Sequence, residues 1–305
     1  MSIDFNLPNE LYHYTSLETF KLILENHTWR LSSINYTNDL SEDLNLYIKQ
    51  LLNDKKLISN INPSIKRDII HHIDVNNYYG SKKYFVACFS DQKDDLGQWR
   101  VSYGNYGQGV CIGINPNFFT RHLYYKDKDR LGWAKITYEP LEQKKLLKDI
   151  TCKLEKYDDN LISDNSLELS YELRDIAMVM KHRAFRIENE YRLIVSMVDD
   201  KILDDNFHSL EEDLQKNEND RQYFIKNNNP NIQDEYIVKC LDYDLDSFAR
   251  EGEGNLFQSI LLGKDCQMSI DDVRGLLKEN GFDDSNIEVS KSDIPYRFSD
   301  DRKNK

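Results

Sequence analysis

The chain has 305 residues, with 40 lysines and arginines against 53 aspartates and glutamates, so its formal net charge is −13. A protein that coats nucleic acid needs excess cationic side chains to displace counterions, so this balance argues against that class and requires a local cationic cluster for any anionic ligand. The length suits one large domain, or two small ones, with a sizeable core.

The N-terminal residues lack the basic and apolar regions of a signal peptide, and no apolar run approaches the roughly 20 residues that cross a bilayer. We therefore expect a cytoplasmic protein with no membrane partner. The five cysteines are too few and too widely spaced for a disulfide framework, and none form a C-x-x-C pair that could hold zinc. They are interpreted as reduced packing residues, and no metal site is predicted.

Strands and helices alternate in the first part of the chain. Ser16 is a predicted N-cap, because it precedes apolar residues at helical spacing. The glycines and aspartates after residue 90 predict a structured loop with about one helical turn. The strands are predicted over residues 11–15, 29–33, 84–90 and 109–114, and the helices begin at residues 17 and 44.

In the second part of the chain, the sequence pattern predicts two helices within an insertion at about 140–183 and a polar, mobile insertion at about 199–234. Its strongest strand signal is 186–198. The order of elements favours a single α+β domain over residues 1–305, built on short, mainly antiparallel strands with helical insertions. The other elements expected here are strands over 135–138, 236–241, 259–263 and 287–290 and a helix over 270–280.

The segment FRIENEYRLIV carries two acidic side chains between two arginines. In a strand, Arg186, Glu188, Glu190 and Arg192 would share one face. One explanation is a solvated sheet face on which opposite charges pair. The other is a cleft in which Glu190, assisted by Glu188, stabilises developing positive charge, as the cleavage of a glycosidic bond requires.

Two further sets of residues could contact a ligand. In LYHYT, His13 shares a strand face with Leu11 and Thr15, while Tyr14 faces the other side with Tyr12, and either residue could be structural instead. The glycine-containing loop presents three aromatic side chains, which could stack on a planar ring or cover the end of the core. These are Trp99, Tyr103 and Tyr106.

Several segments, in this order, resemble a bacterial family catalogued as domain of unknown function 2971. The segments are LYHYTSLETFKLILENHTWRLSSINYTND, FVACFSDQKDDLGQWRVSYGNYGQGVCIGI, FRIENEYRLIV, SILLG and SDIPYR. The opening strand, helix and second strand also resemble, more distantly, the start of ADP-ribosyltransferase folds. That resemblance implies an ADP-ribosyltransferase-like fold with a split sheet, and NAD as co-substrate.

The resemblance also implies site residues. His13 matches the first-strand residue that holds NAD, accompanied by Tyr14 and Thr15. Glu190 matches the catalytic glutamate, with Glu188 as the upstream acid of an E-x-E motif. Both departures from the family pattern, the long helical pair before Glu190 and the undetermined second motif, leave the substrate open. The candidates for the second motif are Ser90, Trp99 and Tyr103.

Cleavage of the nicotinamide–ribose bond builds positive charge on the sugar, which a carboxylate at Glu190 would stabilise. Guanidinium groups fit the pyrophosphate. This assignment requires the side chains of His13 and Glu190 to converge on one cleft. The arginines that could meet the pyrophosphate are Arg30, Arg100, Arg186 and Arg192.

The leading hypothesis is thus an NAD-dependent ADP-ribosyltransferase, a bacterial toxin or antiphage defence effector that modifies an unknown protein or nucleic acid. The first alternative is a non-catalytic module on the same fold that binds a nucleotide or a partner protein. The second is an NAD hydrolase, in which water replaces the acceptor. The oligomeric state is left open.

Overall fold

The computed structural model describes ten segments of the chain, and every structural statement below concerns these residues. Within them, no helix combines the length and the apolar character that crossing a bilayer demands. The predicted site residue Tyr103 lies outside them. The described ranges are 7–34, 44–55, 61–75, 83–100, 104–120, 130–155, 162–197, 222–225, 236–245 and 255–295.

The strands of the described segments form one mixed, mainly antiparallel sheet. Its strand order is β10-β9-β4-β1-β3-β2-β8-β7, with β6 on β3 and β5 on β6. The pair β9–β10 is parallel, and the other pairs are antiparallel. The strands are β1 (Leu11–Thr15), β2 (Thr28–Ser33), β3 (Lys83–Ser90), β4 (Val110–Ile114), β5 (Arg130–Lys135), β6 (Glu190–Met197), β7 (Gln222–Ile225), β8 (Tyr236–Asp244), β9 (Phe257–Leu262) and β10 (Glu288–Lys291).

The sheet divides at β3. Strand β6 pairs along the whole of β3, from Lys83 to Ser90, so β1 and β2 must share the other edge. Strand β1 takes the end of that edge, with Tyr12 opposite Ser90, and β2 takes its beginning, with Ser32 opposite Val86. The predicted mainly antiparallel α+β architecture is therefore confirmed. The division of the sheet follows from the strand register.

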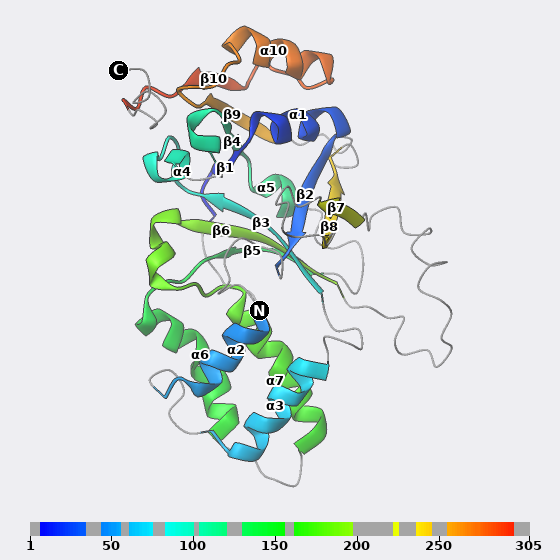
Figure 1. Cartoon of the computed structure of the whole chain (residues 1–305), viewed down its shortest axis with the longest axis vertical. Helices are drawn as coiled ribbons and strands as arrows, with labels where there is room; N and C mark the ends of the chain where they lie inside the picture. The colour runs from blue at the N-terminus through cyan, green and yellow to red at the C-terminus, as the bar shows by residue number, and fades with distance from the viewer. Residues whose placement is uncertain are drawn as a thin grey trace, which may run out of the picture.

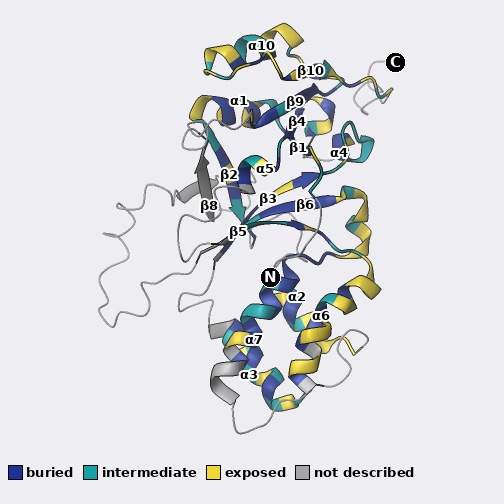
Figure 2. Cartoon of the chain, turned by 180° about the vertical axis from the view of Figure 1, so that it is seen from behind, coloured by how far each residue is buried: buried dark blue, intermediate teal, exposed yellow. Residues whose placement is uncertain are grey.

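Helices cover both faces of the sheet (Figure 1). One apolar core joins the first face to α1, α5 and α10, and a second core joins the opposite face to α2, α3, α6 and α7. Figure 2 shows much of the central strands and the inner sides of the helices as buried and the outer sides of the helices as exposed. The helices are α1 (Leu17–Asn26), α2 (Leu44–Asn53), α3 (Pro63–Val75), α4 (Leu96–Arg100), α5 (Asn117–Thr120), α6 (Pro140–Glu155), α7 (Ile162–Ala177) and α10 (Ile270–Glu279), with 3₁₀ turns η3 (Asn105–Gly107) and η5 (Arg183–Glu188).

Three expectations about elements need correction. A strand was expected over 135–138, but strand β5 covers 130–135 and ends at Lys135. Strand β6 begins at Glu190, because η5 occupies 183–188 and Asn189 adopts a left-handed conformation with φ 43° that interrupts an extended chain. Part of 199–234 is strand β7, and the rest of that insertion lies outside the described residues.

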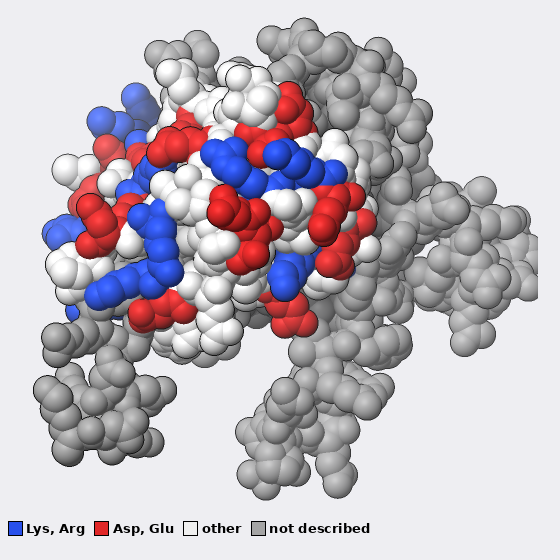
Figure 3. All heavy atoms as spheres, turned by 90° about the horizontal axis from the view of Figure 1, so that it is seen from above, with Lys and Arg blue, Asp and Glu red and all other residues white. Residues whose placement is uncertain are grey.

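Charges of both signs are mixed on the face that carries α10 and β10 (Figure 3). Arg274 and Lys278 both lie close to Asp284, at 3.3 and 3.5 Å between charged atoms. Lys93 pairs with Glu288 at 2.9 Å. These three cations therefore lie next to carboxylates, and this face mixes both signs of charge.

Candidate functional site

Glu190, the first residue of β6, lies at the centre of a buried charge cluster. The Nε atom of Arg192 donates to its Oε1 at 2.6 Å, and Nη2 donates to its Oε2 at 3.3 Å. Lys181 Nζ donates to the same Oε2 at 3.2 Å and to Oε2 of Glu188 at 2.8 Å. The predicted strand face shared by Arg186, Glu188, Glu190 and Arg192 is therefore wrong, because Arg186 and Glu188 lie in η5. Lys181 instead joins Glu188 to the pair formed by Glu190 and Arg192.

The cluster fixes the charge of Glu190, which is only 3% exposed. Burial alone would raise the pKa of this carboxyl group, but the charges of Arg192 and Lys181 outweigh burial and lower the pKa to about 2. Glu190 is therefore an ionised carboxylate at neutral pH. Such a group can accept hydrogen bonds and stabilise positive charge, but it cannot act as a proton donor.

This lowered pKa predicts an acid-dependent loss of stability. Because the pKa of Glu190 falls from 4.5 to about 2 on folding, its contribution is complete above pH 4.5 and is lost as the pH falls towards 2. We expect the unfolding free energy to fall by about 3 kcal/mol more over this range in the wild type than in Glu190→Gln. Urea unfolding at several pH values measures the difference, and equal pH slopes would contradict it.

The three strands that carry the predicted motifs are adjacent. Tyr12 of β1 lies opposite Ser90 of β3, and Ser90 lies opposite Glu190 of β6. Residues directly opposite in a sheet point to the same face, so these three side chains form a row. Cys88 precedes Ser90 by two residues on that face and is exposed, so this face reaches solvent beside the row. Of the candidates for the second motif, Ser90 therefore lies beside Glu190.

His13 is not part of this row, and its predicted convergence with Glu190 is wrong. Alternation along β1 turns His13 to the opposite face, where its ring lies 5.2 Å from Trp29 and 5.5 Å from Phe89. Its Nδ1 donates to the carbonyl oxygen of Cys88 at 2.8 Å, in the gap between β1 and β2. Burial lowers the pKa of His13, which favours the neutral ring. His13 therefore contacts β3 at the point between its pairing with β1 and its pairing with β2.

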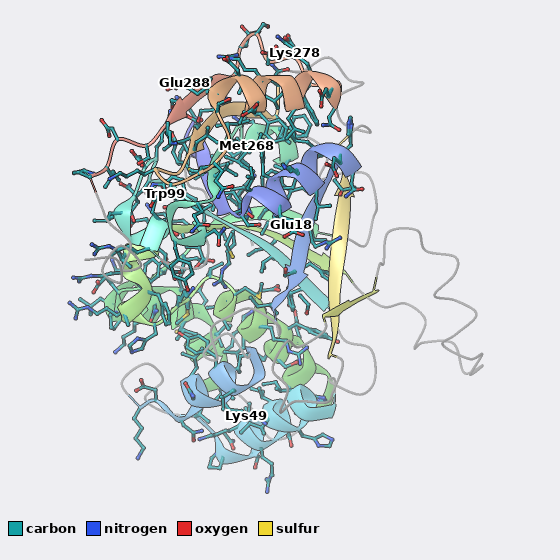
Figure 4. All side chains as sticks on the ribbon, turned by 45° about the horizontal axis from the view of Figure 1, so that its top comes forward. Glu18, Lys49, Trp99, Met268, Lys278 and Glu288 are labelled. Carbon is teal, nitrogen blue, oxygen red and sulfur yellow. The ribbon has the colours of Figure 1, made fainter. Side chains whose placement is uncertain are left out.

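Two predicted ligand contacts lie in the protein interior instead. Trp99 of α4 is fully buried, with its ring edge-on to Tyr14 at 5.0 Å and its Nε1 donating to Asp94 at 2.7 Å (Figure 4). The hydroxyl of Tyr14 accepts from the backbone of Asp95 and donates to that of Gln92, both at 2.8 Å. These side chains fix the loop after β3, so neither is positioned to stack on or bind a ligand.

The remaining candidates are spread over the sheet. Thr15 is buried in β1, opposite Val110. Arg30 of β2 lies opposite Asp242 of β8, so it does not pair with the strand of Glu190. Arg100 is exposed at the end of helix α4. Of the predicted pyrophosphate ligands, Arg192 is committed to Glu190. Arg186 is exposed in η5.

Part of the chain matches a known family model. Residues 98–193 match the family described as "Protein of unknown function (DUF2971)". This supports the first resemblance over less than half of the chain. No curated protein and no solved structure matches the chain significantly.

The DUF2971 match contains two residues of the site that sequence reasoning missed. Lys181 lies before the predicted strand, and a single lysine there gave no signal. Tyr138 lies after β5, and its hydroxyl accepts a hydrogen bond from the backbone nitrogen of Glu190 at 3.0 Å. The match also contains Glu188, Glu190 and Arg192, but neither β1 nor β3. It therefore covers the charge cluster and not the rest of the row.

Proposed function

We propose that this protein is an NAD-dependent ADP-ribosyltransferase in which the carboxylate of Glu190 stabilises the transition state. The observation that carries the proposal is the row Tyr12–Ser90–Glu190, which joins the three strands bearing the expected motifs on one face. Tyr12 takes the first-strand position in place of His13. The exposed side chain of Cys88 supports access to this face.

The charge of Glu190 suits the reaction. Cleavage of the nicotinamide–ribose bond develops positive charge on the sugar, and an ionised carboxylate stabilises that charge more in the transition state than in the ground state. Lys181 is closer to Glu188, at 2.8 Å, than to Glu190, at 3.2 Å. A ribose hydroxyl can thus replace Lys181 at Oε2 of Glu190 while Lys181 keeps Glu188 as its partner.

A second candidate is a module that binds a nucleotide without turning it over. It is favoured by the low exposure of Glu190 and by the two cations that already neutralise its charge. The acceptor, and the toxin or defence role that the resemblance implies, stay predictions.

The test is incubation with NAD labelled on the adenylate, in a lysate that contains protein and nucleic acid. We expect label on a macromolecule with the wild type, reduced at least about 100-fold in Glu190→Gln, since a stabilising group acts mainly in the transition state. Glu18→Gln, at an exposed position of α1, is the matched control. Thermal unfolding of each variant establishes that it is folded.

The outcomes separate the candidates. Free labelled ADP-ribose indicates the hydrolase instead of the transferase. Unchanged NAD in all conditions overturns both enzymatic functions, and NAD binding by calorimetry under those conditions supports the binding module. Ser90→Ala is a second variant that leaves the charge cluster in place, and we expect it to slow transfer because Ser90 borders Glu190 in the row.

A further inference from the structure

A groove of about 840 Å³ lies beside the charge cluster, on different side chains from the row. Its walls come from α2 and the residue that follows it, from Tyr138 and the first turn of α6, and from η5 with its N-cap. Pockets that hold small ligands are typically about 300–1,000 Å³, so the groove has room for a nucleotide. The lining residues are Tyr47, Gln50, Leu51, Asp54, Tyr138, Pro140, Gln143, His182, Arg183, Ala184 and Arg186.

One wall of the groove carries two arginines and a histidine. His182, Arg183 and Arg186 all come from one short segment, and all three are exposed. The carboxylate of Glu139 lies 3.8 Å from Arg183, measured between Oε1 and Nε, which is too long for a hydrogen bond. In a chain with a net charge of −13, such a cluster is the local positive site that an anionic ligand requires.

Hydrogen bonds hold this cationic segment in place at both ends. At its start, the backbone nitrogen of Ala184 donates to Nδ1 of His182 at 3.2 Å, so the neutral ring carries its proton on Nε2 and can donate from there. At its end, the backbone nitrogen of Asn189 donates to the carbonyl of Arg186 at 3.3 Å. The flanking Lys181 is held by Glu188 and Glu190. Hydrogen bonds therefore hold the backbone that carries Arg183 and Arg186.

The groove also offers aromatic and amide groups. Tyr47 and Tyr138 are both partly buried in its lining, and their rings suit a planar base. The amide nitrogen of Gln143 donates to the carbonyls of Thr137 and Lys181, both at 2.9 Å, which fixes its orientation. Cations on one side and tyrosines in the same hollow fit a ligand with both a phosphate and a flat ring.

We propose that this groove binds a nucleotide, with its phosphates against Arg183, Arg186 and His182 and its base against Tyr47 or Tyr138. Guanidinium forks pair with phosphate oxygens in two parallel hydrogen bonds, which gives the arginines the main share of the affinity. The proposal does not depend on NAD turnover. Tyr138 nevertheless connects the groove with Glu190 through the hydrogen bond to its backbone nitrogen.

Isothermal titration calorimetry with AMP and ADP tests the proposal, and adenosine and inorganic phosphate serve as partial ligands. We expect the wild type to bind ADP more tightly than either partial ligand. The variant Arg183→Ala with Arg186→Ala should lose at least about tenfold in ADP affinity, since each charged pair contributes a sizeable share. Lys144→Ala with Lys148→Ala is the matched control, because these exposed residues of α6 lie outside the lining of the groove.

Absence of ADP and AMP binding to the wild type, or equal affinity in the arginine variant, overturns the proposal. A second titration, with NAD, establishes whether the groove binds a dinucleotide or a free nucleotide. Loss of NAD affinity in the arginine variant assigns the dinucleotide to this groove, while an unchanged NAD affinity beside a lost ADP affinity assigns a free nucleotide. ADP binding and the transfer of label from NAD are separate measurements on the wild type, so failure of NAD transfer and failure of this proposal are distinguishable.

Discussion

Replacing Arg192 with methionine should lower the free energy of unfolding by about 3–5 kcal/mol at pH 7, because it leaves a buried charge without its main partner. Arg192 is 2% exposed, donates to both carboxylate oxygens of Glu190 and donates to the carbonyl of Met178 at 3.1 Å. Methionine fills similar volume but can satisfy neither acceptor. Urea unfolding monitored by circular dichroism measures the change.

Two further variants separate charge from packing at Arg192. Arg186→Met makes the same change at an exposed position and should alter stability by no more than about 0.5 kcal/mol. Combining Arg192→Met with Glu190→Gln should recover part of the loss, since the unpaired carboxylate is then absent. A loss below about 1 kcal/mol for Arg192→Met alone would contradict the interpretation of the cluster as a buried network.

Trp99→Ala should lower the free energy of unfolding by about 3–5 kcal/mol, because a fully buried indole is removed from the small cluster that also contains Tyr14, Cys111 and Leu261. Its loss also leaves Asp94 without the indole hydrogen bond at 2.7 Å. Near-ultraviolet circular dichroism and urea unfolding together measure the effect.

Trp99→Phe is the control, because it keeps an aromatic ring against Tyr14 and removes only the indole nitrogen and some volume. We expect about 1–2 kcal/mol for this change. If Trp99→Ala left stability unchanged and instead abolished ligand binding, the side chain would be a ligand platform, which is one of the two interpretations that the sequence left open.

Alternation along the strands predicted the faces of β1 correctly. It placed His13 on one face and Tyr12 and Tyr14 on the other, as the structure has them. The sequence could not tell which of these faces Glu190 shares, because that depends on the pairing of β1 and β6 with β3. Register between distant strands is set by tertiary packing, and a shift of one residue exchanges the faces.

The pattern around Glu190 failed for a local reason. Alternating charges in Arg186 and Glu188 suggested a strand, yet Asn189 adopts the left-handed conformation that asparagine tolerates better than most residues. An asparagine directly before Glu190 was a usable signal for the start of β6. The groove gave no comparable signal, since its walls come from three elements far apart in the chain.

The division of the sheet at β3 also has a consequence for how the protein folds. The contact between His13 and Cys88 joins residues 75 positions apart, so it forms only after a long loop has closed. The ion pairs of Lys181, Glu188, Glu190 and Arg192, in contrast, lie within one short stretch of chain and need little loop closure. The charge cluster can therefore assemble early, whereas the row Tyr12–Ser90–Glu190 is expected to form late, because β3 must pair with both β1 and β6 across long stretches of chain.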